Sequence, residues 1–218
     1  SPGSTVIATT GILVEDCTGT GINMADNFVA VPTDAIVTDG CDFIDENSEL
    51  VGGDQASTSG VVSTSGDSVT LSGTTISGFD TGVESDAGTL SVIDYATIAG
   101  GSEGISAYDT QLLINYADLD GGASGVGLVV EDSGEALMYC VNLTGSVGME
   151  ILNTDFRYNM GDVSSTLGVF VSDSVGKIEN LTWTSAVTTQ IELDQGAMVT
   201  SIGQDLTPSL LVVPTGTM

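Results

Sequence analysis

The chain has 218 residues, 41% of them hydrophobic, and it carries 30 acidic residues against two basic ones, with no His. The hydrophobic content is enough for a continuous core and excludes a disordered chain. A formal net charge of −28 repels phosphates and anionic lipid surfaces, which excludes nucleic-acid binding. The sequence contains neither an apolar run long enough to span a membrane nor a signal peptide, and it leaves open whether a leader is removed before Ser1.

The excess of acidic residues predicts a salty, extracellular setting. Like charges at this density repel one another in dilute buffer, whereas about 1 M salt shortens the Debye length to about 3 Å and removes most of that cost. The near absence of Lys favours a halophilic source; the alternative is an ordinary extracellular protein that is acidic for solubility. Cys17, Cys41 and Cys140 allow at most one disulfide and no disulfide framework.

The first 50 residues are predicted to form a cap or attachment segment. They hold two of the four prolines and two of the three cysteines. Short apolar segments at residues 11–14 with 21–22, and at 35–37 with 43–44, have the character of imperfect coils. We expect this part to block the N-terminal end of a stacked structure.

Residues 66–152 contain the strongest pattern in the chain, a repeat of 21 to 24 residues. Four segments each hold an apolar residue, another five positions later, and a glycine two positions after that: LSGTTISG at 71–78, IDYATIAG at 93–100, INYADLDG at 114–121 and MYCVNLTG at 138–145. A second glycine, followed by an apolar residue, recurs at 82–83, 104–105, 127–128 and 148–149. Three apolar columns and two glycine columns therefore repeat together.

Between these columns the chain is rich in Val, Ile, Thr and Ser, with Gly and Asp as punctuation. This is strand and turn chemistry, and the pattern of a leucine-rich repeat is absent. The sequence predicts an all-β fold, a right-handed parallel β-helix or solenoid, in which equivalent residues stack at about 4.8 Å. Glycines at the corners are expected to supply positive φ where one strand turns into the next.

The predicted β-helix occupies residues 51–205, with its clearest coils at 66–152 and less regular ones at 178–181 and 190–193. Residues 206–218 are expected to form an extended C-terminal tail that covers the last coil or adds a strand to a neighbouring subunit. The predicted solenoid thus has irregular capping segments at both ends.

Glycine-cornered coils of this length resemble the β-helices of viral tail spikes and capsid appendages and those of pectate-lyase-like enzymes. The resemblance covers residues 66–152, and more loosely 10–200, and rests on repeat geometry without a family motif. It implies the fold, assembly as a homotrimer with other virion or surface proteins, and contact with host glycans. The functional residues of those families have no matching positions here, so no activity follows from the resemblance.

No catalytic residue is assigned from the sequence. A pectate-type lyase needs a cation and a basic residue. Arg157 and Lys177 are the only basic side chains, lie outside the clear repeats, and are expected to be surface or ion-pairing residues. A glycoside hydrolase needs two carboxylates about 5 to 9.5 Å apart, for which stacked coils offer Asp94, Asp118, Asp120 and Glu131. Acids are so frequent in this chain that closeness alone does not indicate catalysis.

Aromatic residues make up only 5% of the chain, which disfavours a sugar-stacking cleft. Four tyrosines nevertheless lie within the coils: Tyr95, Tyr108, Tyr116 and Tyr139. Tyr95 and Tyr116 share a column of the repeat and are expected to stack on each other.

The metal-binding residues stay unknown, and no cofactor is predicted. Carboxylate-rich turns at 118–120 and 131–132 would hold Ca²⁺ or Mg²⁺ only weakly, because neither an EF-hand loop nor a calcium-binding nonapeptide repeat is present. Asn142 and Asn180 begin glycosylation sequons, and whether either is modified is left open. The GVG segment at 125–127 is interpreted as a pair of turn glycines, because no helix is predicted after it.

Together these features predict a structural surface appendage rather than an enzyme. The leading hypothesis is a spike, turret or fibre component of a halophilic virus, placed on the virion surface, that decorates the particle or attaches it to host glycans. Two alternatives stay open: a polysaccharide hydrolase with paired carboxylates, and a cellular surface-layer protein or adhesin located outside the cell. Neither membrane insertion nor nucleic-acid binding is predicted. The receptor, the symmetry and the position on a particle are not specified by the sequence.

Overall fold

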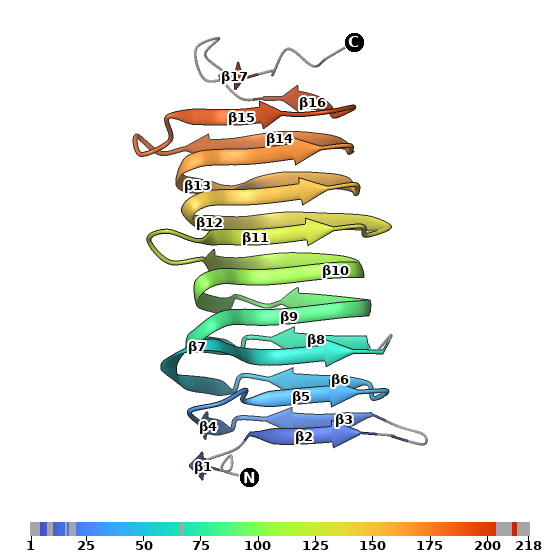
Figure 1. The fold of residues 1–218 in the computed structure, drawn as a ribbon, viewed down its shortest axis with the longest axis vertical. Coiled ribbons are helices and arrows are strands. Elements are labelled where there is room, and N and C mark those ends of the chain that lie inside the picture. The colour runs from blue at the N-terminus through green and yellow to red at the C-terminus, as the bar shows by residue number, and fades with distance from the viewer. Residues whose placement is uncertain are drawn as a thin grey trace.

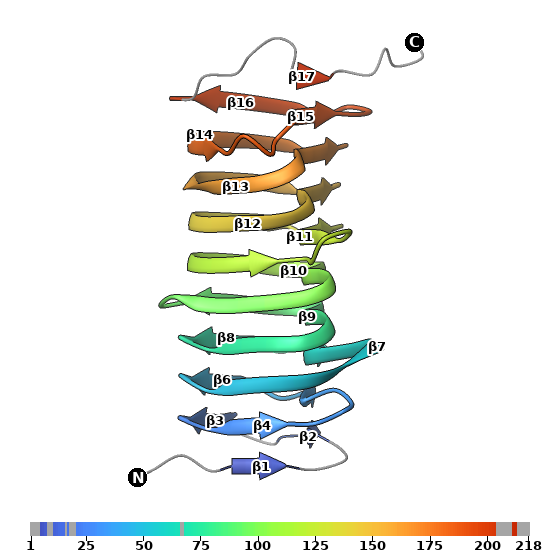
Figure 2. The ribbon, with the colours of Figure 1, turned by 90° about the vertical axis from the view of Figure 1, so that its left-hand side faces the viewer.

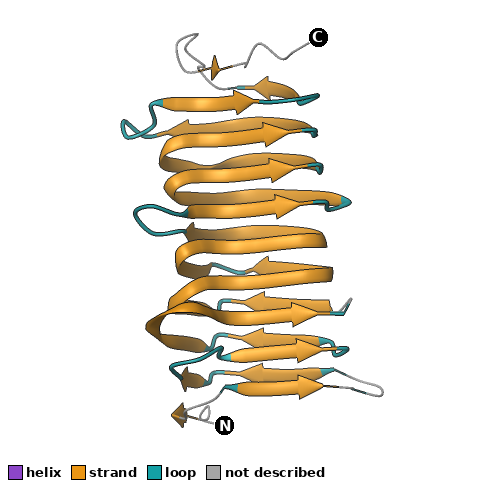
Figure 3. Cartoon of the chain, viewed as in Figure 1, coloured by secondary structure: helices purple, strands orange, loops and turns teal. Residues whose placement is uncertain are grey.

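The computed structural model describes residues 5–7, 11–15, 17, 21–65, 68–203 and 211–212. In this part of the chain the regular elements are all strands (Figure 3), and no helix capable of crossing a bilayer is found. The strands are β1 (Thr5–Ile7), β2 (Ile12–Glu15), β3 (Ile22–Ala25), β4 (Phe28–Ala30), β5 (Ile36–Asp39), β6 (Phe43–Glu46), β7 (Glu49–Thr64), β8 (Ser68–Ser72), β9 (Thr75–Ile93), β10 (Ala96–Asp120), β11 (Val126–Glu131), β12 (Glu135–Leu152), β13 (Asp155–Ser172), β14 (Val175–Trp183), β15 (Thr189–Leu193), β16 (Met198–Ile202) and β17 (Leu211–Val212).

These strands wind into a parallel β-solenoid of about 8 turns, which confirms the predicted fold class. In Figure 1 the chain climbs from bottom to top while its front strands run to the right and its rear strands run to the left. Figure 2 shows the third side, where the chain passes from the rear to the front, as β4 does. The coil is therefore right-handed. Successive turns pair in parallel, as β2 does with β5 and β3 with β6.

Each turn contributes to three sheets, and the longer strands bend around the corners between them. The front sheet contains β2, β5, β11, β15, β17 and residues 61–64, 83–86, 103–108, 147–152 and 167–172. The rear sheet contains β3, β6, β8, β16 and residues 89–93, 111–115, 135–139, 155–159 and 175–179. The side sheet contains β1, β4 and residues 49–51, 75–77, 97–98, 117–120, 141–144, 161–163 and 181–183.

The core consists of the apolar columns that the repeat predicts. Alternate residues of each strand point inward, so equivalent side chains stack from turn to turn and lose their contact with water. The front sheet supplies the buried residues Val61, Val83, Ile105, Leu128 and Met149. The rear sheet supplies Leu71, Val92, Ile114 and Met138.

The prediction for the rear column is wrong at one position. The sequence alignment places Ile93 there, whereas Val92 is the residue paired with both Leu71 and Ile114. Ile93 pairs with Ser72 and is only half-buried. The cause is one extra residue at the next corner, where both Asp94 and Tyr95 have positive φ. A one-residue shift exchanges the inward and outward faces of a strand.

The two glycine columns are required for different reasons, and only the first includes residues with the positive φ that the sequence predicts. In the first column Gly78 and Gly145 do have positive φ, with values of 74° and 154°. The second column instead requires space. A Cβ atom on Gly82 or Gly104 would lie 2.4 Å from the carbonyl oxygen of the next glycine in the column. This glycine ladder is longer than the sequence indicated: Gly60, Gly82, Gly104, Gly127, Gly148 and Gly168. Gly127 therefore lies within β11 and is not a turn glycine.

A ladder of buried hydroxyl groups closes the corner between the front and rear sheets. The backbone N–H of Thr110 donates to Ser133 Oγ at 3.1 Å, that of Ser133 to Thr154 Oγ1 at 3.0 Å, and that of Thr154 to Ser174 Oγ at 2.9 Å. An Asp or Asn with positive φ precedes each of these four residues. The ladder satisfies buried N–H groups that would otherwise cost free energy at a corner.

The turns near the two ends follow the same register as the central ones. β5 and β6 pair with strands on both sides, and β2 and β3 pair with β5 and β6, although all four strands fall in the segment predicted as a cap. A disulfide joins Cys17 to Cys41, and Cys140 is free. β17 pairs with β15, while most of the predicted C-terminal tail lies outside the described residues.

Candidate functional site

The corner between the rear and side sheets carries a column of left-handed backbone conformations. Two residues after the second inward position of each rear strand, φ lies between 53° and 71°. We call these nine aligned positions the left-handed column: Asp26, Asn47, Gly73, Asp94, Tyr116, Cys140, Met160, Asn180 and Gly203. Gly, Asn and Asp adopt this backbone region at the lowest cost, and they fill six of the nine positions.

Tyr116, Cys140 and Met160 are the exceptions, and they occupy three consecutive turns. An ordinary side chain in the left-handed region costs about 1–2 kcal/mol. Conformations of this kind concentrate at functional sites, where the surroundings hold them in place. Gly, Asn and Asp are absent at these three adjacent positions, although the turns on either side have Asp94 and Asn180 in the column. These three side chains therefore mark the corner as the candidate site.

Three tyrosines gather at this corner. The ring centroids of Tyr95 and Tyr116 are 5.2 Å apart, which confirms that the two rings contact each other, although the backbone register is shifted by one residue. Tyr139 extends the row, with its ring centroid 5.8 Å from that of Tyr116 in an edge-to-face arrangement. Tyr95 is 77% exposed, Tyr116 37% and Tyr139 40%. Exposed aromatic surface of this extent is typical of binding sites.

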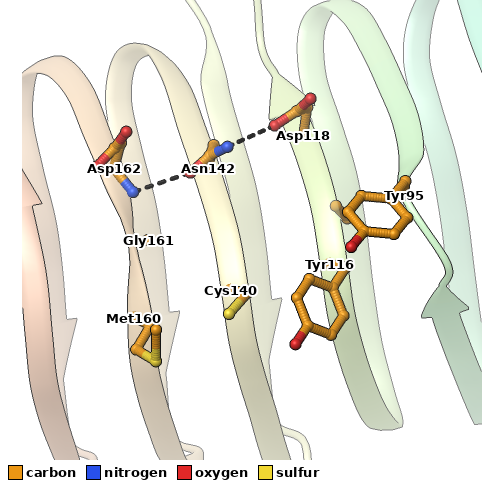
Figure 4. A pocket seen from close by; sticks show the side chains of 9 residues that line it. Tyr95, Tyr116, Asp118, Cys140, Asn142, Met160, Gly161 and Asp162 are labelled. Atoms are coloured by element: carbon orange, nitrogen blue, oxygen red, sulfur yellow. Dashed lines mark hydrogen bonds between the residues drawn. The ribbon is translucent and has the colours of Figure 1, made fainter.

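A polar row runs beside the tyrosines on the adjoining part of the side sheet. Asn142 Nδ2 donates to Asp118 Oδ1 at 2.7 Å, and the backbone N–H of Asp162 donates to Asn142 Oδ1 at 3.0 Å. These hydrogen bonds fix the Asn142 amide between two exposed carboxylates on neighbouring turns. Figure 4 shows the two rows side by side, with Asp118, Asn142 and Asp162 in one and Tyr116, Cys140 and Met160 in the other.

The two rows enclose a depression of about 310 Å³. We call it the tyrosine groove, and its lining side chains are Tyr95, Tyr116, Ala117, Asp118, Cys140, Asn142, Met160 and Asp162. The lining holds two carboxylates and no basic group. The Cys140 thiol, and then the Tyr139 phenol, raise the pKa of Tyr116, because a second ionised group beside them is unfavourable. The Tyr116 hydroxyl therefore stays a neutral donor and acceptor at neutral pH.

The acids considered for a hydrolase do not come together as one pair. Asp118 lies in the tyrosine groove, whereas Asp94 accepts a hydrogen bond from Ser72 Oγ at 2.9 Å and Asp120 one from the N–H of Gly122 at 2.8 Å. Glu131 lies at the end of β11 on the front sheet. The other carboxylate of the groove is Asp162, which lies in the same row as Asp118, two turns further along, and which the sequence pattern did not indicate.

The two basic residues form ion pairs, as the sequence predicts. Arg157 and Lys177 are neighbours on the rear sheet, and each lies 2.8 Å from a carboxylate oxygen of Glu179. The hydrogen bond from Lys177, followed by that from Arg157, lowers the pKa of Glu179. Both cations are thus occupied by one surface carboxylate, and neither lines the tyrosine groove.

Metal ligands do not cluster in the described part of the chain. No group of three or more Asp, Glu or Cys side chains is arranged to hold an ion there, including the turns at 118–120 and 131–132. One acid is inside the core: Asp45 takes an inward position between Met24 and Leu71 and is fully buried. Thr74 Oγ1 donates to its Oδ2 at 2.6 Å, while its Oδ1 has no partner. Burial raises the pKa of Asp45, which favours the neutral acid.

The rear sheet has a second notable surface. The central outward column of this sheet carries no carboxylate over its whole length: Asn23, Ile44, Thr70, Ser91, Leu113, Leu137, Arg157, Lys177 and Thr200. The equivalent front column includes Glu84, Glu150 and Glu192. Leu113 and Leu137 border a hollow of about 250 Å³ on the rear sheet. We call this stripe the acid-free column.

Comparison with known proteins does not extend these observations. No protein-family model, no curated protein and no solved structure matches the chain. The candidate sites therefore rest on the geometry of the solenoid. Of the two sequon asparagines, Asn142 lies in the tyrosine groove with its amide hydrogen-bonded, and Asn180 lies in the left-handed column.

Proposed function

We propose that this protein is a structural appendage displayed on the outside of a virion or a cell. In the form we favour it is a spike, turret or fibre component of a halophilic virus, assembled as a homotrimer and used for particle decoration or host attachment. The observation that carries the proposal is the acid-free column, because a rod with a net charge of −28 keeps one complete stripe of its surface free of carboxylates.

Charge repulsion explains why this stripe matters. Two copies of the chain repel each other wherever their acidic surfaces meet, and salt reduces that repulsion without removing it at short range. Protein interfaces are depleted in charge at their centre and enriched in apolar side chains. The acid-free column offers Leu113 and Leu137 on the rear sheet, beside a hollow whose lining includes one carboxylate, Glu135. It is thus the surface best suited to contact a second copy, and cyclic symmetry would close such contacts into a trimer.

Two further features support an extracellular location. The disulfide between Cys17 and Cys41 is of a kind that persists in oxidising surroundings. The acidic surface suits concentrated salt, where its self-repulsion is screened. A cellular surface-layer protein or adhesin would share both features, so the genomic neighbourhood and the assembled particle separate it from a virion component.

The enzyme alternative has one observation in its favour, the two carboxylates that flank the tyrosine groove. Asp118 and Asp162 lie two turns apart, which is about 9.6 Å at the usual spacing of strands and falls at the wide end of the range for inverting hydrolases. A general acid in such an enzyme is usually shielded from water so that it stays protonated, and both side chains are exposed. Release of reducing sugar that is lost in Asp118→Asn would favour the hydrolase.

Light scattering on matched variants tests the assembly. We expect a trimer in about 1 M salt that loosens on dilution, when screening weakens. Leu113→Asp should give monomers in the same salt, because it places a carboxylate in the acid-free column. Leu13→Asp is the control, since Leu13 is an exposed leucine in the outward column of the front sheet. A folded wild-type monomer at both salt concentrations would contradict the proposal.

A further inference from the structure

We infer that the tyrosine groove binds a neutral oligosaccharide that lies along the solenoid axis. The inference names the ligand class for the attachment role proposed above and rests on that role for its biological meaning. It is carried by a separate surface, the corner between the rear and side sheets, and by different residues from those of the acid-free column.

The groove is built at the expense of the local backbone. In the turns on either side, the left-handed column holds Asp94 and Asn180, which suit the conformation. Within the groove it holds Tyr116, Cys140 and Met160, which do not. Asn at these positions would keep the corner and remove the groove lining. The selection of larger side chains therefore indicates contact with something outside the chain.

The chemistry of the lining selects among ligands. The rings of Tyr95 and Tyr116 line the groove and offer apolar surface of the kind on which the C–H faces of sugar rings pack, and Tyr139 supports the Tyr116 ring from beside the groove. Asp118 and Asp162 accept hydrogen bonds from sugar hydroxyl groups, and the Asn142 amide is held in position between them. The groove has no basic residue, so an acidic sugar or another anion would meet two carboxylates without compensation.

A cationic ligand is favoured less. Carboxylates occur over much of this protein, which has 30 acidic residues in 218, so two in the groove do not distinguish it from the rest of the surface. What distinguishes the groove is the gathering of three of the chain's five tyrosines at one corner. Recognition by stacking and hydrogen bonding, without net charge, fits that difference.

The direction of the ligand follows from the stacking of the turns. Asp118, Asn142 and Asp162 occupy equivalent positions of successive turns, and so do Tyr116, Cys140 and Met160. Both rows therefore run parallel to the solenoid axis (Figure 4). An extended chain of sugar rings placed along the groove would contact Tyr116, Cys140 and Met160 on one side and the polar row on the other. Longer oligosaccharides should thus bind more tightly than a single sugar.

Titration of the assembled protein in molar salt tests the inference. The probes are maltotriose, cellotriose, mannotriose and chitotriose as neutral sugars, sialyllactose as an acidic one, and tetramethylammonium as a cation. Binding is followed by calorimetry and by NMR of ¹³C-labelled tyrosine rings. We expect at least one neutral trisaccharide to bind and to shift the signals of Tyr95 and Tyr116, the two tyrosines that line the groove. The signal of Tyr158, which is fully buried, should stay unchanged.

Tyr116→Asn is the decisive variant, because Asn suits the left-handed backbone and removes the central ring. We expect it to weaken sugar binding about tenfold or more while the melting temperature stays the same or rises. Tyr108→Asn is the control, since Tyr108 is an exposed tyrosine at the end of a front-sheet segment outside the groove.

Three results would overturn the inference: no binding of any neutral sugar by folded wild type, unchanged affinity in Tyr116→Asn, or binding of sialyllactose or tetramethylammonium alone. A wild type that forms trimers but binds no sugar would refute this inference and leave the assembly proposal standing. A monomer that binds the neutral sugar would refute the assembly proposal and leave this inference standing.

Discussion

The glycine ladder predicts a large difference between two glycine-to-alanine substitutions. A Cβ atom on Gly104 would lie 2.4 Å from the carbonyl oxygen of Gly127, which is 0.6 Å inside the 3.0 Å limit that real Cβ atoms essentially never cross. Its next contacts, with the O and N atoms of Asp120 at 3.2 and 3.3 Å, are also backbone atoms. No side chain can rotate away, so Gly104→Ala must push two turns of the solenoid apart.

Overpacking of this kind typically costs about 1–3 kcal/mol. Alanine also restricts the unfolded chain relative to glycine, which returns about 0.4–1 kcal/mol. The net loss for Gly104→Ala should therefore be about 1 kcal/mol, or a fall of about 2–4 °C in melting temperature for a domain of this size. The control is Gly134→Ala, where a Cβ would meet no heavy atom within 4 Å. That variant should be neutral or slightly more stable.

Thermal unfolding in molar salt, followed by circular dichroism, measures both variants. A substitution at Gly40 separates the requirement for space from the requirement for positive φ. Gly40 has open space around it but a φ of 69°. Gly40→Asn should be tolerated because Asn adopts positive φ, whereas Gly104→Asn should be at least as damaging as Gly104→Ala. Equal melting temperatures for Gly104→Ala and Gly134→Ala would refute the steric explanation of the ladder.

Three other features of the fold can each be tested by substitution. Burial raises the pKa of Asp45 above its ordinary 3.8, so ionisation of this buried carboxyl lowers the stability of the fold as the pH rises through the raised pKa. In denaturant titrations, wild type should therefore lose stability relative to Asp45→Asn between pH 4 and pH 7. Parallel pH profiles of the two proteins would exclude this explanation. Replacing Cys17 and Cys41 by Ser should cost about 3 kcal/mol for a separation of 24 residues, while Cys140→Ser, which breaks no disulfide, should melt near wild type. Met160→Asn should gain about 1 kcal/mol by relieving its left-handed backbone, and Met160→Ala should not; equal melting temperatures would count against strain at this position.

Most of the fold could be predicted from the sequence because of the repeat. Equivalent residues of a solenoid share one environment, so columns such as Val83, Ile105, Leu128 and Met149 appear in the sequence as recurring apolar positions. The alignment failed at Ile93, where an extra corner residue moved the strand by one position. A recurring Asp or Asn followed by Ser or Thr, as in Asp132-Ser133, was a visible signal of the buried hydroxyl ladder that the sequence analysis did not use.

The tyrosine groove could not be predicted from the repeat alone, because the repeat does not reveal which corner residues have a left-handed backbone. The repeat in the sequence aligns Tyr95 with Tyr116, whereas in the structure Tyr116 aligns with Asp94 in the left-handed column. Tyr139 joins the row from an outward position of the rear sheet. An aromatic content of 5% suggested too few rings for a sugar-binding surface, but a global fraction does not describe how many rings share one corner.

Departures from the repeat are where a solenoid has room to carry function, because residues that obey the repeat are already explained by stacking. By this criterion two departures stand out in the part of the chain that the structure describes. Asp45 replaces an apolar core residue, and it is hidden from any partner by complete burial. Tyr116, Cys140 and Met160 replace residues that suit a left-handed corner, and they line an open groove. The second departure is accessible and its cost recurs over three consecutive turns, whereas the opposite corner has Ser65 and Ala87 with positive φ in two turns. A single unfavourable residue is tolerated by chance more easily than three aligned ones, so selection for contact explains the groove better than drift does.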